Sequence, residues 1–392
     1  MNVYFDNNAT TRVAPEVVEA MMPFFGELYG NPSSMHAFGG NVAKYVDKAR
    51  EQVAAFLNAS PEEIIFTSCA TESDNTALRG GIEYLGEKSA LITTAVEHPA
   101  ILQSAHKVGE MGHEVVKLGV DHKGQINLEE LKAQLKANNE KGVKSLVSIM
   151  WANNETGVIF PMEQIADICK EYGAVLHTDA VQVAGKIKVD VKKVPVDMLS
   201  MSGHKFHAPK GIGILYLRKG SFFRPFMLGG HQERGLRAGT ENVPYIVGLA
   251  KACEIANYDE TGIGAMRDKL QAGIMAALPD SIINGDTEHR LPGTLNISFP
   301  YVEGEAIAYH LSDAGICIST GSACASGSLD PSHVIRAMGV PFIAVHGSVR
   351  FSLSRYNTME EVDYVLEKLP PIIKNLRALS PFGPDKGVTT YE

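Results

Sequence analysis

The stretch PMEQIADICKEYGAVLHTDA, residues 161–180, predicts a helix followed directly by a buried strand. The helix is expected to end at Gly173, because glycine tolerates the left-handed backbone angles that commonly close a helix. The next residues, AVLHTDA, form an apolar run of strand length. A helix that leads straight into a buried strand is the repeating unit of sheets whose strands run parallel.

The same alternation extends on both sides of this stretch. Expected helices cover 41–58 and 70–85 and follow Pro99, and expected strands cover 64–68, 90–96 and 144–151. The pattern predicts an α/β fold with a mostly parallel sheet that carries helices on both faces. From about residue 260 strands become sparser, which predicts a smaller α+β unit with helices at 265–277, 303–314 and 358–377 and strands at 294–299 and 348–354.

Composition narrows the class of protein. The 392 residues are 45% hydrophobic and 21% charged, and the formal net charge is −9. This balance argues against nucleic acid as the main partner, because phosphate backbones need a positive surface. No apolar run approaches the roughly 18–20 residues of a membrane helix, and the first residues do not resemble a secretory signal. Five cysteines without a CxxC pair argue against disulfides and zinc ribbons, so a cytoplasmic location is expected.

The stretch SMSGHKFHAPKGIGILYL, residues 200–217, places Lys205 where a strand is expected to end. A lysine amine acts as a nucleophile only when part of it is neutral, which burial or a neighbouring positive charge permits. Asp179 ends the preceding expected strand 26 residues earlier, enough for one crossover, so both groups are expected to face one crevice. Thr71 stands at an expected helix N-terminus, a position that favours phosphate. Singly, Lys205 is more often a turn lysine and Asp179 more often a cap or loop residue, and Thr71 is equally often a plain helix cap; their combination indicates a site.

Ten motifs in order resemble one family across residues 3–378. They are YFDNNATT (4–11), GNPSS.H (30–36), TSCATESDN (67–75), EHPA (97–100), NNETG (153–157), HTDAVQ (177–182), SGHK..APKGIG (202–213), ERG.RAGT (233–240), GSACASGS (321–328) and RFSLSR (350–355). The pattern is similar to the cysteine desulfurases of the NifS/IscS type, class V aminotransferases of fold-type I that use pyridoxal 5′-phosphate, and more to their NifS-like branch. The resemblance implies a large cofactor-binding domain with a seven-stranded sheet at 15–258, and a small domain from 1–14 and 259–392.

The resemblance also implies a role for each matching residue. Lys205 would hold the cofactor covalently and then move protons, Asp179 would keep the ring nitrogen protonated, and His98 would stack on the ring and assist proton transfer. Arg350, together with Asn154, would bind the substrate carboxylate, for which a planar guanidinium is well suited. The other cofactor contacts would be Ala70, Thr71, Asn154, Gln182, Ser202 and His204, with Thr240 reaching the cofactor of the partner subunit in a homodimer.

Cys324 is the cysteine to which the resemblance assigns chemistry. It stands in STGSACASGS, whose small residues predict a loop rather than a core segment. Cys317 is expected at a core position, and Cys69, Cys169 and Cys253 are expected to pack, Cys69 less clearly because it adjoins the phosphate helix. In the implied reaction, L-cysteine gives L-alanine and a persulfide on Cys324, whose sulfur passes to an iron–sulfur scaffold protein, with nitrogenase cofactor assembly as one destination.

Two other interpretations stay open at this level. A selenocysteine lyase or an aminotransferase of the same group would use the same cofactor, although an aminotransferase would not need the thiol of Cys324. A sulfur- or metal-carrying scaffold is also conceivable with 13 histidines, but no set of histidines and cysteines has metal-ligand spacing. A resident metal is therefore not expected, and Cys324 is considered only as a transient ligand of a cluster.

Overall fold

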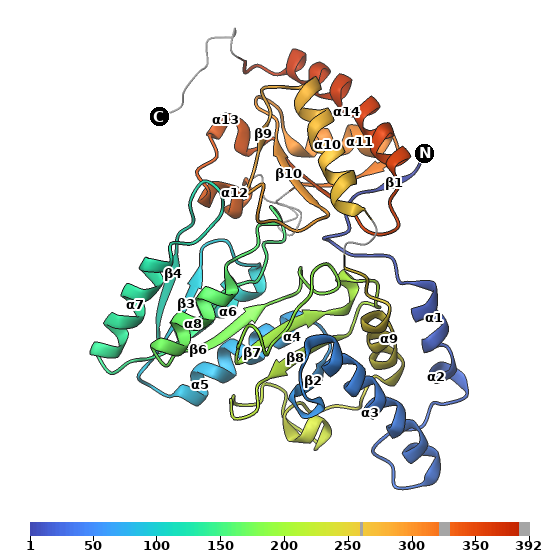
Figure 1. Ribbon diagram of the computed structural model, residues 1–392, viewed down its shortest axis with the longest axis vertical. Helices are drawn as coiled ribbons and strands as arrows, with labels where there is room; N and C mark the ends of the chain where they lie inside the picture. The colour runs from blue at the N-terminus through green and yellow to red at the C-terminus, as the bar shows by residue number, and fades with distance from the viewer. Residues whose placement is uncertain (259–261, 321–329, 384–392) are drawn as a thin grey trace.

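The computed structural model describes residues 1–258, 262–320 and 330–383. Among them, seven strands form a large sheet in the order β2–β8–β7–β6–β5–β3–β4, in the lower half of Figure 1. β8 runs antiparallel to both of its neighbours, and the other strands are parallel. The predicted α/β fold with a mostly parallel sheet is confirmed. The strands are β2 (Ile64–Thr67), β3 (Ser89–Thr94), β4 (Glu114–Leu118), β5 (Lys144–Ser148), β6 (Val175–Asp179), β7 (Met198–Ser202) and β8 (Gly213–Leu217).

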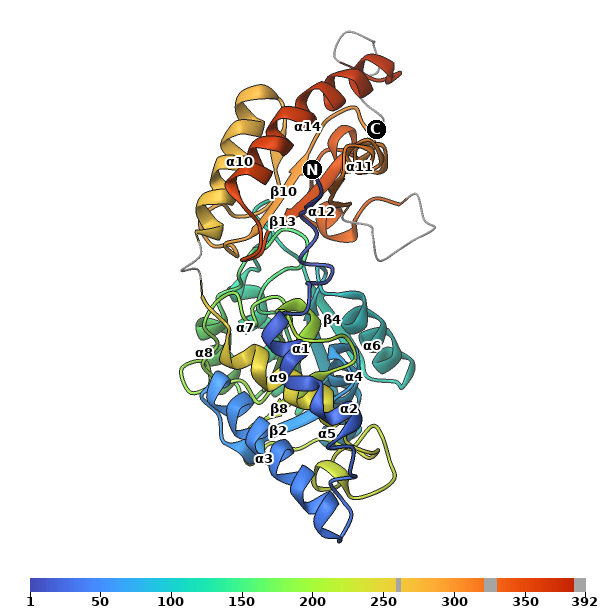
Figure 2. The same ribbon diagram turned by 90° about the vertical axis from the view of Figure 1, so that its right-hand side faces the viewer.

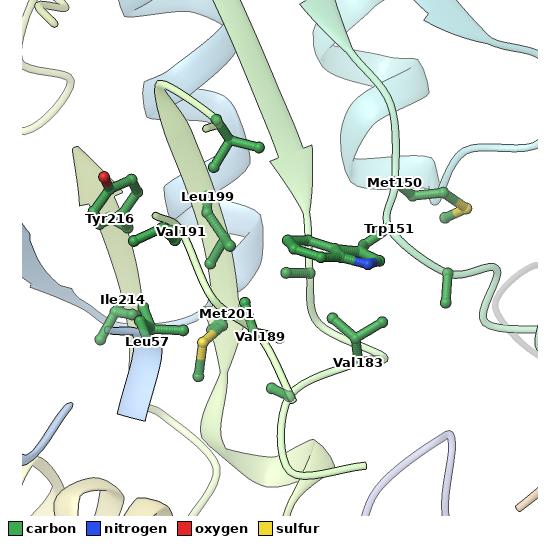
Figure 3. Close-up of a cluster of buried hydrophobic side chains, with 14 of the residues drawn as sticks. Leu57, Met150, Trp151, Val183, Val189, Val191, Leu199, Met201, Ile214 and Tyr216 are labelled. Carbon is green, nitrogen blue, oxygen red and sulfur yellow. The ribbon is translucent and has the colours of Figure 1, made fainter. Parts of the chain in front are cut away.

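Helices cover both faces of this sheet. Successive strand residues point to opposite faces, so Leu199 belongs to one hydrophobic cluster and its neighbour Met198 to another. Figure 3 shows part of the first cluster, with Leu199 and Met201 of β7 beside Ile214 of β8. Burial on both faces explains why the strands read as continuous apolar runs. The first cluster includes residues of α1 (Pro15–Met21), α3 (Ala37–Leu57), α7 (Leu128–Glu140), α8 (Met162–Glu171) and α9 (Val243–Glu254); the second includes residues of α5 (Gly81–Leu85) and α6 (Pro99–Glu110).

A smaller antiparallel sheet lies above the large one in Figure 1, with the strand order β12–β13–β10–β9. Its own hydrophobic cluster includes residues of three helices. The predicted elements of this part are present within a few residues of their expected bounds. They are α10 (Ile263–Ala277), β10 (Thr294–Ser298), α11 (Gly304–Asp313), β13 (Ser348–Ser352) and α14 (Met359–Leu379). The short elements β9 (Ile282–Ile283), β12 (Ser319–Thr320), α12 (His333–Ala337) and α13 (Phe342–Val345) were not predicted.

The first residues of the chain belong to the smaller part. β1 (Val3–Tyr4) pairs in parallel with β11 (Ile316–Cys317), and Asp6 forms a bridge with Ser352 of β13. Figure 2 shows the N-terminus beside the smaller sheet, from which the chain descends to α1. We propose the domain division at 15–258 on this basis: the two sheets have separate clusters. The exceptions are residues outside 15–258 that belong to the cluster of the large sheet, namely Ala14, Leu291, Val334, Ile335, Met338 and Val345.

No helix within the described ranges has both the length and the apolar character that a membrane crossing requires.

Candidate active site

A cavity of about 300 Å³ opens at the carboxyl ends of β6 and β7. This is the edge at which open α/β sheets bind ligands. Ser319 and Thr320 of β12 and Arg350 of β13 contribute to the wall, so both sheets form the cavity. Ten of the predicted site residues line it, namely Ala70, Thr71, His98, Asn154, Asp179, Gln182, Ser202, His204, Lys205 and Arg350.

Lys205 reaches the cavity from a tight turn directly after β7. Gly203 opens this turn, and a Cβ atom there would lie 2.9 Å from Cβ of Ala208, closer than packed carbon atoms approach. Glycine therefore lets the chain turn within three residues of the strand end. The Lys205 amine donates hydrogen bonds to the main-chain oxygens of Asn8 and Ala9, each at 2.8 Å.

Asp179 ends β6, the parallel neighbour of β7. Its side chain is buried, and Oδ1 accepts a hydrogen bond from the main-chain N–H of Val181 at 2.9 Å. Burial raises the pKa of Asp179 to about 6, with the Val181 N–H and the charge of Lys205 acting in the opposite direction. The carboxyl group is thus mostly ionised at neutral pH and can pair with a cation in the cavity.

His98 caps the N-terminus of α6, and its Nδ1 accepts a hydrogen bond from the main-chain N–H of Ala100 at 3.1 Å. Burial, together with the charges of Lys205 and His333, lowers the pKa of His98 to about 4. His98 is therefore neutral at physiological pH. Because Nδ1 accepts a hydrogen bond, the ring proton is assigned to Nε2.

The N-terminus of α4 (Ala70–Asn75) faces the cavity through Ala70 and Thr71. Cys69 precedes the helix without a side-chain cap from the described residues, so the first main-chain N–H groups stay available to an anion. Gly213 of β8 makes this approach possible, since a Cβ there would lie 2.8 Å from the carbonyl carbon of Cys69. Burial lowers the pKa of the nearby His204 to about 4, so its ring is neutral.

Arg350 and Asn154 are joined by a hydrogen bond of 2.9 Å from Nη1 of Arg350 to the main-chain oxygen of Asn154. Nη2 of Arg350 donates to Oδ1 of Asp6, also at 2.9 Å. Gln182 donates from Nε2 to the main-chain oxygen of Asn8 at 3.1 Å. Asp6 and Asn8 were not expected to belong to the site, although both stand in the motif YFDNNATT.

Two predicted site residues are not brought to this cavity. Thr240 is exposed and lines a different cavity, beside Glu233 and Arg237. Its expected role is toward a partner subunit, so its place in one chain leaves that prediction untested. Cys324 lies outside the described residues.

The remaining cysteines differ in their surroundings. Cys317 is exposed, so the expectation that it packs in the core is wrong. It is the last residue of a two-residue strand, where the side chain alternates away from the buried Ile316. Cys169 and Cys253 are buried as expected, and burial raises the pKa of both thiols. Cys69 is half-buried and lines the cavity.

The donors and acceptors of the cavity fit pyridoxal 5′-phosphate. This molecule has an anionic phosphate, a basic ring nitrogen and an aldehyde, which require an anion site, a carboxylate and an amine respectively. The uncapped N-terminus of α4, the buried Asp179 and the Lys205 amine supply these three features in one cavity.

The chain matches one family model and is similar in sequence to named proteins over nearly its whole length. Residues 3–365 match the family model "Aminotransferase class-V". A "Cysteine desulfurase" of Trichormus azollae is 55% identical over 98% of this chain and 96% of that protein. "Cysteine desulfurase NifS" of Azotobacter vinelandii is 51% identical with the same coverage.

Solved structures agree with the sequence relatives. A "NIFS-LIKE PROTEIN" superimposes with a TM-score of 0.89 at 45% identity, covering 96% of this chain and all of that one. A structure titled "SspA in complex with cysteine" has a TM-score of 0.80 at 34% identity over 91% of this chain and all of that one. With the family model spanning most of its length and relatives over half identical to it, the chain belongs to the class-V aminotransferases and, within them, to the cysteine desulfurases.

Proposed function

We propose that the protein removes sulfur from L-cysteine to give L-alanine, with pyridoxal 5′-phosphate as cofactor and a persulfide on Cys324 as the enzyme-bound product. The observation that carries this proposal is the cavity shared by the Lys205 amine and the Asp179 carboxylate on neighbouring strands. The names of the relatives support cysteine as the substrate.

Several residues would hold the cofactor. Lys205 would bind it covalently, and the ionised Asp179 would favour a protonated ring nitrogen. The N-terminus of α4 with Ala70 and Thr71, together with Ser202 and His204, would bind the phosphate, while His98, Gln182 and Asn154 would contact the ring. When bound, pyridoxal phosphate supplies an electron sink that makes the Cα proton and the Cβ–S bond of cysteine labile.

The chain supplies the remaining steps of the reaction. Arg350 would bind the carboxylate of cysteine, competing with its present partner Asp6. The Lys205 amine would take the Cα proton. The thiolate of Cys324 would then attack the substrate sulfur, so that an S–S bond forms while the Cβ–S bond breaks. The three-carbon fragment keeps the electron pair of that bond and takes up protons to become alanine.

The finer parts of the proposal concern partners. The persulfide sulfur would pass to an iron–sulfur scaffold protein, with Cys324 as a transient cluster ligand, in a cytoplasmic homodimer that Thr240 helps to complete. One relative is named NifS, which favours nitrogenase cofactor assembly as the destination of the sulfur. A selenocysteine lyase or an aminotransferase is the alternative for the same cavity.

Mass spectrometry after addition of L-cysteine tests the proposal. We expect one added sulfur on the peptide that contains Cys324, together with alanine in the solution. Cys324→Ala should abolish both, whereas Cys317→Ala, which removes a thiol that is exposed in the structure, should change neither. Alanine formation that survives in Cys324→Ala would contradict the persulfide and favour a lyase, whereas a keto acid that keeps the sulfur, formed in place of alanine, would favour an aminotransferase.

The covalent cofactor has its own test. Lys205→Ala should lose the cofactor mass that borohydride reduction fixes to the wild-type protein. Lys210→Ala is the matched control, because Lys210 follows in the same turn region with an exposed side chain. Cofactor that stays covalently attached after Lys205→Ala would contradict the assigned linkage.

A further inference from the structure

Lys186 is a second lysine beside the candidate active site, with no role in the reaction proposed above. It lies in the turn after β6, four residues beyond Gln182, and is half-buried. Its Nζ atom donates to Oδ1 of Asn8 and to Oε1 of Gln182, each at 2.7 Å. Both of these acceptors are amide oxygens rather than carboxylates.

The charge of Lys186 is disfavoured where it lies. Burial lowers its pKa well below the usual range, and the charges of Lys205 and Arg350 lower it further. A neutral amine keeps two N–H donors. The hydrogen bonds to Asn8 and Gln182 use exactly these two donors, so they persist when the third proton leaves.

These two bonds fix the direction of both amide groups. With Oδ1 of Asn8 facing Lys186, Nδ2 of Asn8 donates to the main-chain oxygen of Asn154 at 3.2 Å and to Oγ1 of Thr294 at 2.9 Å. With Oε1 of Gln182 facing Lys186, Nε2 donates to the main-chain oxygen of Asn8. A reversed amide would turn its NH₂ group toward the amine and lose these contacts.

Asn8 connects this network to two groups with proposed roles. Its main-chain oxygen also accepts a hydrogen bond from Lys205, while Asn154, which it holds, accepts one from Arg350. Lys186 and Lys205 further line the same small cavity of about 40 Å³. Lys205 and Gln182 thus share the main-chain oxygen of Asn8, and the Asn8 side chain shares the main-chain oxygen of Asn154 with Arg350.

We propose that Lys186 is a positioning residue: by fixing the amide groups of Asn8 and Gln182, it sets the places of Lys205 and Arg350 in the cavity. This inference rests on the proposed function, because it takes the cavity to be the site of pyridoxal phosphate and cysteine. It explains why a lysine lies among amide oxygens at a place where a charge is disfavoured.

The test compares Lys186→Met, which keeps the length but removes the donors, with Lys188→Met, an exposed control two residues along. Titration of cofactor-free protein with pyridoxal phosphate should give an affinity about tenfold weaker for Lys186→Met, equivalent to about 1.4 kcal/mol, the scale of one or two lost hydrogen bonds. The absorbance band of the bound cofactor should shift, and KM for cysteine should rise along with a lower kcat. Lys188→Met should match the wild type in all of these.

Lys186→Gln is the second variant, because its amide restores donors on a shorter side chain, and it should recover part of the affinity. Lys186→Leu, which also lacks donors, replaces Lys186→Met in the comparison if the methionine variant does not fold. Affinity, absorbance and KM within about twofold of wild type in the folded variant would overturn the inference. A wild type that binds the cofactor but releases no sulfur would instead contradict the proposed function, and the binding comparison would still decide the role of Lys186.

Discussion

Glu97 is a carboxyl group without exposed surface one residue before His98. Its Oε1 accepts hydrogen bonds from the Thr94 hydroxyl at 2.8 Å and from the main-chain N–H of Met150 at 3.0 Å. Burial nevertheless raises the pKa of Glu97 to about 8. At neutral pH the folded protein therefore holds a proton on this group that an unfolded chain releases.

This proton makes stability depend on pH. Between about pH 4.5 and 8 the folded state binds the Glu97 proton and the unfolded chain does not, so the free energy of unfolding falls as pH rises, by at most about 1.4 kcal/mol per unit from this group. Above pH 8 its contribution levels off. Glu97→Gln should make the decline shallower in urea unfolding of the cofactor-free protein, whereas the exposed Glu83→Gln should not. Parallel curves for Glu97→Gln and wild type would contradict the raised pKa.

The sequence predicted most residues that line the cavity, but it did not predict the residues that hydrogen-bond to them and position them. Lys205 and Asp179 end neighbouring strands, a position that local apolar runs reveal. Asn8 contacts Lys205 across 197 residues of sequence and Lys186 across 178. No local pattern records such a contact, so Asn8 and Lys186 could not be recognised from the sequence alone.

At the scale of elements, the predicted bounds of long buried segments and the mostly parallel course of the large sheet agree with the structure, whereas the direction of the antiparallel strand β8 was not predicted. The helix expected at 161–173 is α8, and the strand expected at 174–180 is β6. β4 was not predicted, because its residues are mostly half-buried or exposed and the apolar run is short. β8 runs antiparallel to β7 because a short connection after Lys205 reverses the chain. The alternation of apolar residues within a strand does not show such a reversal.

α12 offers a test of one element. Its cap, Ser332, accepts hydrogen bonds from the N–H groups of Val334 and Ile335 and donates to Oε2 of the buried Glu155 at 2.6 Å. Ser332→Ala should lower the free energy of unfolding by about 1 kcal/mol through loss of the cap. It should also leave Glu155 without this hydrogen-bond donor, which adds to the loss. Thr358→Ala at the start of α14 removes an exposed cap only. In urea unfolding Ser332→Ala should be the more destabilising variant, and equal losses would contradict the link between α12 and Glu155.

At the scale of the whole molecule, Thr240 is exposed and lies away from the cavity of Lys205 in the same chain. In the proposed dimer each cavity receives Thr240 from the partner subunit. A single chain would then bind the phosphate less well than two chains together. Full phosphate binding would require the dimer, because Thr240 and Lys205 line different cavities of the same chain.

Hybrid dimers test this arrangement. Lys205→Ala lacks the amine, and Thr240→Asp would place a carboxylate against the partner's phosphate. Each variant alone should be inactive toward cysteine, but subunits mixed after denaturation and refolding should regain activity, since one cavity of each hybrid has both native residues. A mixture of Lys205→Ala with Lys205→Arg is the control and should stay inactive. No recovery in the first mixture would contradict a shared site.

The contacts of Asn7 and Asn8 with β13 affect the order in which the chain can fold during its synthesis. Asn7 donates from Nδ2 to the main-chain oxygen of Ser352, 345 residues away, and the main-chain N–H of Asn8 donates to the hydroxyl of the same serine. Asn7 and Asn8 can therefore make these contacts only after β13 has been translated. A nascent chain stalled before β13 lacks Ser352 and cannot finish the wall that Asn8 supplies, so competence for catalysis arises only once β13 has been made.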